Sequence, residues 1–439
     1  MIILRYEQGH IRIIGSKIQI GDEEKDLYPA YLYPKIKSCL EVHGKNYRDE
    51  VPAKECGVEL TSDIHLREYQ REALQSWSAA GNRGIIILPT GSGKTVVAIK
   101  AIEELESSTL IVVPTLVLLD QWRESLEEQF GTKTGRLGGG IREIEPITVS
   151  TYDSASIRAD ELGDRFELIV FDEVHHLPAP SYRRIGERYI APYRMGLTAT
   201  LQDNASSRSL LDELVGEVVY HKDVDSLTGV HLANYQVRTV KLPLSKEERV
   251  EYNKRYGIYR SYLSKKGIKI RSKRDYLNFI RMSGRDAGAR RALLSRNRAM
   301  DIALNSSTKI DYLKALLKDK KEHKTLIFTR HNKLVYRISK DLLIPSITHQ
   351  TMREDREETL TMFRRGAYQR IVTSQVLDEG VDVPDASMAV ILSGTGSNRE
   401  FIQRLGRILR PKDGKTAILY ELVSADTAEE YISQRRKGG

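Results

Sequence analysis

The chain has 439 residues, 40% of them hydrophobic and 29% charged, with a formal net charge of +9. This length is too great for one hydrophobic core, so we expect two to four domains. No apolar run approaches the roughly 18 residues of a membrane span, and the N-terminal sequence lacks the basic and then apolar order of a signal peptide. We therefore expect a cytoplasmic protein. Two cysteines, Cys39 and Cys56, are too few for a four-thiolate site, so no structural zinc is expected.

Residues 1–58 are predicted to form a small separate domain of α+β structure. Leu4, Tyr6, Ile11 and Ile13 flank a Gln-Gly-His turn, a pattern that is typical of a β-hairpin. A proline and a polar run then mark the boundary with the next domain.

Two series of short apolar runs alternate with helical stretches along the rest of the chain. Such runs predict strands that are buried on both faces, and hence parallel sheets with helices on each side. We assign the first series to a domain at 59–230 and the second to a domain at 231–439. The predicted strands are 84–88, 109–113, 147–150 and 168–171, then 325–328, 370–373 and 389–392.

A phosphate-binding loop is predicted where LPTGSGKT follows the first of these strands and precedes a helix. Its two glycines allow backbone N–H groups to approach phosphates. The lysine brings a positive charge to the β- and γ-phosphates, and the last threonine offers a hydroxyl to Mg²⁺. The predicted cofactors are therefore ATP and Mg²⁺. The candidate residues are Thr90, Gly91, Ser92, Gly93, Lys94 and Thr95.

An acidic pair, Asp172 and Glu173, follows the strand 168–171 in the sequence DEVHH. Carboxylates at the end of a buried strand are costly unless they bind a metal or act in catalysis. We predict that Asp172 holds Mg²⁺ and that Glu173 polarises the attacking water. The alternative is a helix-capping pair. The adjacent histidines are not predicted to be metal ligands.

Upstream of the loop, LREYQREAL places Arg67 and Gln70 about one helical turn apart. The amide of Gln70 can both accept from and donate to an adenine edge. We therefore predict both residues to contact the nucleotide, with an ordinary surface helix as the alternative.

Together with LTAT at 197–200, these motifs resemble the helicases of superfamily 2. The second half of the chain agrees, because LIFTRHN, VTSQVLDEGVDVP and QRLGRILRP resemble helicase motifs IV, V and VI. IVVPTLVLLDQW, VSTYDSA and DEVHH further resemble the XPB family in its short archaeal form. This resemblance implies an α/β fold of two RecA-like lobes, with a thumb-like helical insert and a small damage-recognition domain at the N-terminus. For that N-terminal domain, a simple cap on the first lobe remains an alternative.

The resemblance also implies roles for residues that match the motifs. Arg407 and Arg410 match arginine fingers that reach the γ-phosphate from the second lobe, and Gln403 matches a contact to that phosphate or to water. Gly380 and Asp382 match positions near the ribose. Thr198 and Thr200 match the link between the ATP state and the grip on DNA.

The net positive charge is concentrated in one segment, residues 246–298, with 17 Lys and Arg against five Asp and Glu. The segment has no strand pattern, and its +12 balance predicts a helical insert that binds a polyanion. Tyr252, Tyr256 and Tyr259 share one helical face, either as a packing stripe or to stack on nucleotides. The candidate phosphate contacts are Lys254, Arg255, Arg260, Lys265, Lys266, Arg271, Lys273 and Arg274.

These predictions combine into an ATP-dependent DNA helicase or translocase. By resemblance it moves 3′ to 5′, belongs to nucleotide excision repair and works with a nuclease partner. The alternative from another class is an ATP-switched DNA clamp that positions this nuclease and unwinds weakly. RNA is a further alternative substrate, although the DEVH box and the insert favour DNA.

One motif of the XPB family is missing. An Arg-Glu-Asp tripeptide that is tied to strand separation normally follows LTAT, whereas this chain has LQDNASSRS at 201–209. We expect Ser206 and Ser207 to be too flexible to oppose base stacking. The ATP motifs are present, so we predict hydrolysis and translocation with weak unwinding by the isolated chain.

Overall fold

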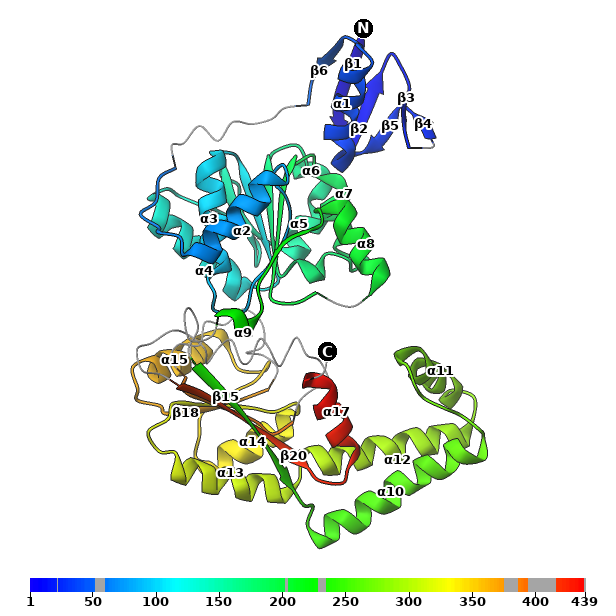
Figure 1. Ribbon diagram of the computed structural model, residues 1–439, viewed down its shortest axis with the longest axis vertical. Helices are drawn as coiled ribbons and strands as arrows, with labels where there is room; N and C mark the ends of the chain where they lie inside the picture. Colours follow the sequence, from blue (N-terminus) through cyan, green and yellow to red (C-terminus); the bar gives the residue numbers. More distant parts are fainter. Residues whose placement is uncertain are drawn as a thin grey trace. The chain divides into compact units, whose positions relative to one another are not determined.

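The computed structural model describes residues 1–21, 23–51, 60–201, 204–227, 234–374, 386–393 and 416–437. The chain divides into two compact units, with the described residues up to 227 in the first and those from 234 onward in the second (Figure 1). The domain boundaries predicted after 58 and 230 both fall outside the described residues. No described helix is both long enough and apolar enough to cross a lipid bilayer.

The first unit begins with a small mixed sheet, the N-terminal module. The predicted hairpin is confirmed: its strands pair antiparallel, with Leu4 opposite Ile13 and Tyr6 opposite Ile11. Gln8 in the turn has a positive φ of 46°, and Gly9 has 83°. The sheet order is β5-β2-β1-β6. The elements of the module are β1 (Ile2–Glu7), β2 (His10–Ile14), β3 (Ile18–Ile20), β4 (Glu23–Lys25), β5 (Leu27–Pro29), η1 (Ala30–Leu32), α1 (Tyr33–Val42) and β6 (Tyr47–Asp49).

The N-terminal module packs against the rest of the first unit. The Tyr6 hydroxyl lies 3.0 Å from the carbonyl oxygen of Ala159 and 3.1 Å from that of Arg188. Ile190 belongs to the apolar core of the module. Burial raises the pKa of Tyr6, which keeps this phenol protonated as a donor. The contact agrees with a cap on the first lobe, and damage recognition remains a prediction.

Lobe 1, the rest of the first unit, is a sheet of eight strands in the order β10-β9-β11-β8-β12-β13-β7-β14. All neighbouring strands are parallel except β9 and β10, as the fully buried strand sequences predict. The strands are β7 (Arg83–Ile87), β8 (Thr109–Val113), β9 (Gly135–Gly138), β10 (Ile141–Glu143), β11 (Ile147–Thr151), β12 (Leu168–Asp172), β13 (Tyr193–Thr198) and β14 (Val218–His221). The helices are α2 (Glu68–Ala79), α3 (Lys94–Leu105), α4 (Leu116–Phe130), α5 (Tyr152–Ile157), α6 (Ala159–Leu162), η2 (Val174–His176), α7 (Arg183–Arg188), α8 (Ala205–Leu214) and α9 (Val224–Leu227).

The expectation that Ser206 and Ser207 are flexible is wrong. Both lie in the first turn of α8, where the Asn204 side chain accepts a hydrogen bond from the Ser206 N–H at 3.2 Å. Arg208 pairs with Asp212 one turn later, at 3.0 Å. An N-cap followed by an amphipathic sequence therefore makes a helix of this segment.

Lobe 2, the second unit, contains an all-parallel sheet in the order β15-β20-β19-β16-β18-β17. The three strands predicted for it are confirmed as β16, β18 and β19. Strands β15, β17 and β20 were not predicted from the sequence. Strand β15 pairs with β20 from Asn234 opposite Thr416 to Leu242 opposite Ser424. The strands are β15 (Asn234–Leu242), β16 (Thr325–Phe328), β17 (Ser346–Ile347), β18 (Arg370–Thr373), β19 (Met388–Ile391) and β20 (Thr416–Ser424). The flanking helices are α13 (Ser307–Asp319), α14 (Asn332–Leu342), α15 (Arg353–Arg364) and α17 (Ala428–Lys437).

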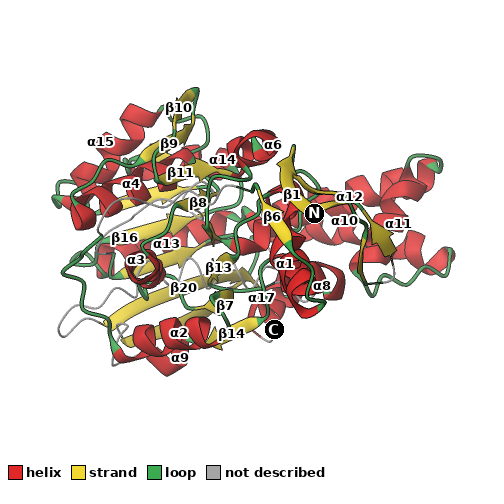
Figure 2. Cartoon of the chain, turned by 90° about the horizontal axis from the view of Figure 1, so that it is seen from above, coloured by secondary structure: helices red, strands yellow, loops and turns green. Residues whose placement is uncertain are grey.

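The basic segment forms three helices between β15 and α13, which we call the insert: α10 (Lys246–Lys265), α11 (Lys273–Ser283) and α12 (Ala287–Leu304). Figures 1 and 2 both show α10 and α12 extending side by side away from the sheet of lobe 2, with α11 at their far end. The packing interpretation of the tyrosine stripe is confirmed. Tyr252 is 3% exposed and Tyr259 is 7% exposed, and Tyr256 stacks on Tyr252 with ring centroids 5.5 Å apart.

Candidate ATP site and nucleic-acid interface

The predicted phosphate loop joins β7 to α3 in lobe 1. Gly91 and Gly93 have φ values of 82° and 83°, a left-handed conformation that favours glycine. A Cβ atom at Gly93 would stand 2.5 Å from the side-chain nitrogen of Gln70, so a larger residue here would displace the Gln70 amide from the loop. The Lys94 ammonium donates to the carbonyl oxygen of Leu88 at 3.1 Å. The lysine therefore contacts the same loop in which a phosphate group is predicted to bind.

The hydroxyl groups of the loop differ in their surroundings. Ser92 is fully buried, and its hydroxyl donates to the carbonyl oxygen of Pro89 at 2.7 Å. Thr90 and Thr95 are half-buried. The Thr90 hydroxyl has no hydrogen-bond partner among the described residues, although the atom is buried. A buried hydroxyl without a protein partner beside a phosphate loop fits a bound ligand oxygen.

Gln70 is 4% exposed and braces the loop through both ends of its amide. Its oxygen accepts from the Arg67 backbone N–H at 2.9 Å, and its nitrogen donates to the carbonyl oxygen of Ser92 at 2.9 Å. The Tyr69 hydroxyl donates to the same carbonyl oxygen at 2.5 Å. Arg67 itself is exposed at the start of α2. Gln70 could contact adenine only by giving up one of these hydrogen bonds, and its contact with adenine remains a prediction.

Asp172 ends the central strand β12 and is 8% exposed. Trp122 donates its indole N–H to one carboxylate oxygen at 2.8 Å, and the Glu173 backbone N–H donates to the other at 3.0 Å. Burial raises the pKa of Asp172, while the Trp122 hydrogen bond and the positive charge of Lys94 oppose this rise. The structure thus brings Asp172 and Lys94 into electrostatic contact, as a shared nucleotide site requires.

Glu173 follows with a φ of 52°, a left-handed conformation that is rare for a residue other than glycine. Its carboxylate accepts from the Thr198 hydroxyl at 3.3 Å and lies 3.3 Å from the His175 ring nitrogen. That same nitrogen is 3.1 Å from the Thr198 hydroxyl. The Thr198 hydroxyl also lies 2.8 Å from the carbonyl oxygen of Thr200. The acidic pair is thereby connected to the LTAT motif at the end of β13.

Two supporting residues escaped the sequence analysis. Trp122 positions the Asp172 carboxylate, and the Tyr152 hydroxyl lies 3.1 Å from the Asp172 carbonyl oxygen and 3.4 Å from that of Glu173. Both aromatic residues are nearly fully buried. Each lies in a stretch that resembles the XPB family, and this was the only signal that the sequence offered for them.

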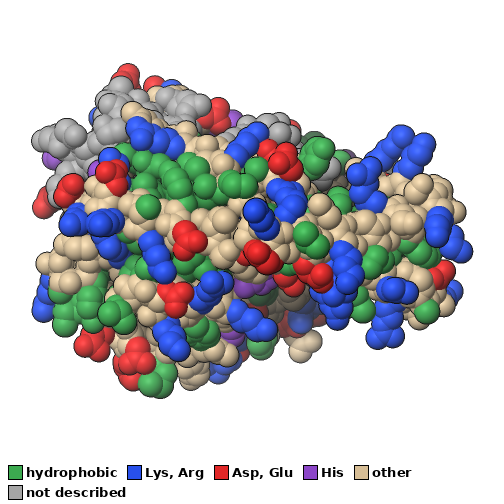
Figure 3. All heavy atoms as spheres, turned by 90° about the horizontal axis from the view of Figure 1, so that it is seen from below, with side chains coloured by type: hydrophobic (Ala, Val, Ile, Leu, Met, Phe, Trp, Pro, Cys, Tyr) green, Lys and Arg blue, Asp and Glu red, His purple; other side chains and the backbone are tan. Residues whose placement is uncertain are grey.

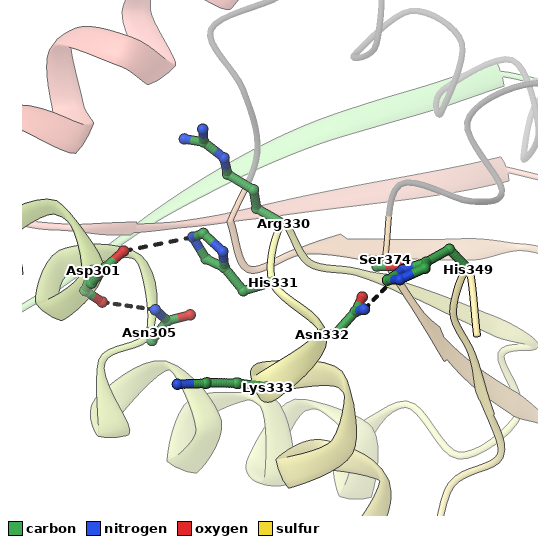
Figure 4. A pocket seen from close by; sticks show the side chains of 8 residues that line it. All are labelled: Asp301, Asn305, Arg330, His331, Asn332, Lys333, His349 and Ser374. Atoms are coloured by element: carbon green, nitrogen blue, oxygen red, sulfur yellow. Dashed lines mark hydrogen bonds and ion pairs between the residues drawn. The ribbon is translucent and has the colours of Figure 1, made fainter. Parts of the chain in front are cut away.

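In lobe 2, several predicted residues lie outside the described part of the chain: Gly380, Asp382, Gln403, Arg407 and Arg410. The described LIFTRHN motif begins on β16 and leads into α14. A pocket of about 840 Å³ opens at this end of the strand (Figure 4). None of its lining residues was predicted as a site residue from the sequence; they are Asp301, Asn305, Arg330, His331, Asn332, Lys333, His349 and Ser374.

The electrostatic balance of this pocket favours an anion. Arg330 and Lys333 are exposed, and Asp301 lies 3.8 Å from the His331 ring. Burial, together with the charge of Arg330, lowers the pKa of His331, so this ring is neutral at neutral pH. The Ser374 hydroxyl is buried without a hydrogen-bond partner among the described residues. Two cations and a spare hydroxyl suit a phosphate group.

The insert presents most of its predicted phosphate contacts to solvent. Arg255 is the exception, because it pairs with Glu251 at 2.5 Å. The side chain of Lys273 lies outside the described part of the chain. Figure 3 shows Lys and Arg side chains gathered at the right-hand end of the molecule, where the insert lies. The exposed members are Lys254, Arg260, Lys265, Lys266, Arg271 and Arg274.

Comparison with known proteins shows the family of the chain. Residues 63–203 match the family model of the type III restriction enzyme res subunit, and residues 308–412 match that of the helicase conserved C-terminal domain. The chain is 41% identical to the DNA 3′-5′ translocase XPB2 of Sulfurisphaera tokodaii over the full length of both proteins. The chain belongs to the XPB family.

Several XPB relatives are longer than this chain. It is 31% identical to the DNA 3′-5′ helicase XPB of Mycobacterium tuberculosis, with 85% of the chain and 63% of the relative aligned. The helicase domain of Pyrococcus furiosus Hef has the same fold, with a TM-score of 0.57, 19% identity, and coverage of 84% of this chain and 97% of that one. The superfamily 2 type of this XPB-family chain implies ATP as its cofactor.

The described residues contain no cluster of three or more His, Cys, Asp or Glu side chains placed to hold a metal. In nucleotide sites Mg²⁺ takes one or two protein oxygen ligands and completes its shell with phosphates and water. The buried Asp172 carboxylate is a ligand of this type, and its binding of Mg²⁺ together with Thr95 remains a prediction. Cys39 is a free thiol, and Cys56 lies outside the described residues.

Proposed function

We propose that lobe 1 hydrolyses ATP at the end of β12 and that each cycle moves the chain along DNA. As a member of the XPB family, the chain is an ATP-dependent DNA 3′–5′ helicase or translocase of the repair type. The observation that supports the residue assignment is the cluster at the ends of β12 and β13. There Asp172, Glu173 and Thr198 are linked through hydrogen bonds.

In this proposal Lys94 leaves the Leu88 carbonyl and neutralises the β- and γ-phosphates. Asp172 and Thr95 would hold Mg²⁺, which would supply positive charge to the same phosphates. Glu173 accepts a proton from the attacking water. Its backbone is held in a left-handed conformation, and its carboxylate is positioned by contacts with Thr198 and His175.

Coupling to movement is assigned to the hydrogen bond between Glu173 and Thr198. A change at the γ-phosphate alters the position of Glu173, and Thr198 transmits this change to the LTAT loop and Thr200. Arg407 and Arg410 are proposed to complete the site from lobe 2. Hydrolysis would then take place only when the two lobes close on ATP.

DNA is proposed to contact lobe 2 at two places, through its phosphates. The pocket at the end of β16 supplies Arg330 and Lys333, with Asn332 held by His349 at 3.0 Å. The insert supplies the larger positive surface. Contacts with phosphates contribute affinity and fix the position of the protein on DNA, but they do not recognise the base sequence.

The proposal extends to a nuclease as the partner protein, which would act on the DNA that this chain moves. The clamp alternative differs from the translocase in one property: ATP turnover would switch binding without displacement along the strand. Its support is the absence of the Arg-Glu-Asp tripeptide from residues 201–209.

The deciding experiment compares the ATPase rate with single-stranded DNA, duplex DNA, forked DNA and RNA. We expect stimulation by DNA and loss of all turnover in Lys94→Ala. A triplex-displacement assay on duplexes with a single-stranded tail of either polarity then separates a translocase from a clamp. Stimulation by RNA alone, or ATP turnover without triplex displacement, would contradict the proposal.

A further inference from the structure

Helix α11, at the far end of the insert, exposes two large apolar side chains. Leu277 is 45% exposed and Ile280 is 40% exposed, whereas Phe279 between them is 2% exposed. The helix is firmly started by a capping box. The Ser272 hydroxyl accepts from the Asp275 N–H at 3.1 Å, and the Asp275 carboxylate accepts from the Ser272 N–H at 2.9 Å.

The buried face of α11 prevents the helix from turning to hide these residues. Phe279 packs in a cluster with Tyr259 of α10 and Ala292 of α12, and the centroids of the two rings are 6.0 Å apart. Arg296 of α12 donates to the Tyr276 hydroxyl at 3.1 Å and lies over its ring, 4.9 Å from the centroid. A rotation that buried Leu277 would expose Phe279 instead.

Two exposed arginines flank the apolar pair. Arg274, Leu277 and Arg281 are spaced at i, i+3 and i+7, which places them on one face of the helix. Neither guanidinium has a carboxylate partner among the described residues. Lys269 and Arg271 are exposed in the connection before the helix. An apolar centre between unpaired cations complements a strand of nucleic acid, in which apolar base faces lie between phosphates.

We propose that α11 is a wedge that inserts Leu277, backed by Ile280, at a base step of DNA. Arg274 and Arg281 hold phosphates that flank this step without being adjacent to each other. The two arginines are about 10 Å apart along the helix axis, which matches phosphates separated by about three base-pair rises of 3.4 Å. Insertion of leucine or isoleucine between bases is an established way for proteins to unstack and bend a duplex. The inference rests on the proposed function, because it requires DNA at the insert.

The test uses a forked duplex with 2-aminopurine at the junction, whose fluorescence rises when the base is unstacked. Binding of the unaltered chain should raise the fluorescence. The variant L277Q/I280Q should lose most of this increase but keep DNA-stimulated ATPase activity and the salt dependence of binding, since its cations remain. Val250→Gln is the matched control, because Val250 is 70% exposed on α10 of the same insert.

A second variant, R274Q/R281Q, tests the phosphate contacts. It should reduce the slope of log K against log salt by about 0.7–0.9 for each phosphate that the chain no longer neutralises. If L277Q/I280Q lowers the melting temperature, Leu277→Ala alone serves in its place because it truncates only one exposed side chain.

The wedge is refuted if the fluorescence increase survives in L277Q/I280Q, or in Leu277→Ala where that variant replaces it, while DNA still stimulates the ATPase. An unchanged salt slope in R274Q/R281Q also refutes it. Loss of self-association with no change on DNA would instead identify α11 as a protein-binding surface. If DNA fails to stimulate the unaltered chain at all, the proposed function itself has failed.

Discussion

Replacement of Trp122 by phenylalanine should shift the pH dependence of ATP hydrolysis. The indole N–H donates to the Asp172 carboxylate at 2.8 Å in a buried site and opposes the rise in pKa that burial causes. A hydrogen bond to a charged group contributes about 1.5–3 kcal/mol, against about 0.5–1.5 kcal/mol for neutral partners. The difference of about 1–1.5 kcal/mol corresponds to about one pKa unit.

The direction of this pH shift follows from the charge state that Asp172 must have in the site. Asp172 must be a carboxylate to hold Mg²⁺, and loss of the donor raises its pKa further, so the proton is released only at higher pH. The acid limb of kcat/KM for ATP, which reports the free enzyme, should therefore move up by about one pH unit. Activity on the alkaline side should be nearly unchanged.

Trp77→Phe is the matched control. Trp77 is 1% exposed and donates its indole N–H to the Arg194 carbonyl oxygen at 2.9 Å, so its replacement removes a similar buried hydrogen bond. It should lower the melting temperature but leave the acid limb in place. The reasoning is refuted if Trp122→Phe keeps the original pH profile, or if both variants shift it equally.

Three further results are expected. Glu173→Gln should bind ATP normally but turn over about 10²-fold more slowly with DNA present, in a steady-state ATPase assay; unimpaired turnover would reject Glu173 as the base. Charge reversal at Arg271, Lys273 and Arg274 together should lower the salt slope of DNA binding by about 0.7–0.9 for each phosphate left without its cation, and an identical slope would show that this part of the insert does not touch DNA. Because the Arg-Glu-Asp tripeptide is absent from residues 201–209, the purified chain should open long forked duplexes poorly in a strand-displacement assay. Efficient opening without a partner, or no gain from Arg-Glu-Asp at 203–205, would show that the missing tripeptide does not limit unwinding.

Local sequence was sufficient to predict the apolar strands β7, β8, β11, β12, β16, β18 and β19 and the phosphate loop. A strand buried on both faces has to be apolar throughout, so runs such as 109–113 and 325–328 can be recognised as strands from the sequence alone. The loop is similarly local, because Gly91 and Gly93 provide backbone conformations that other residues adopt poorly. The acidic pair could be placed because it directly follows one of these strands.

Contacts between distant parts of the chain could not be predicted in this way. Strand β15 pairs with β20 from Asn234 opposite Thr416, although the whole insert lies between them. The partnership of Trp122 with Asp172 spans 50 residues. Strand pairing and side-chain partners over such separations depend on how the elements pack, which a single sequence does not record.

The tyrosines of the insert show what the sequence could determine and what required the tertiary structure. Their spacing placed them on one face of a helix, but this pattern is compatible both with packing inside the protein and with stacking on bases. Only the position of α12 and Phe279 decided between the two, by burying Tyr252 and Tyr259. Periodicity is a property of one helix, whereas burial depends on the neighbours that the tertiary fold brings to it.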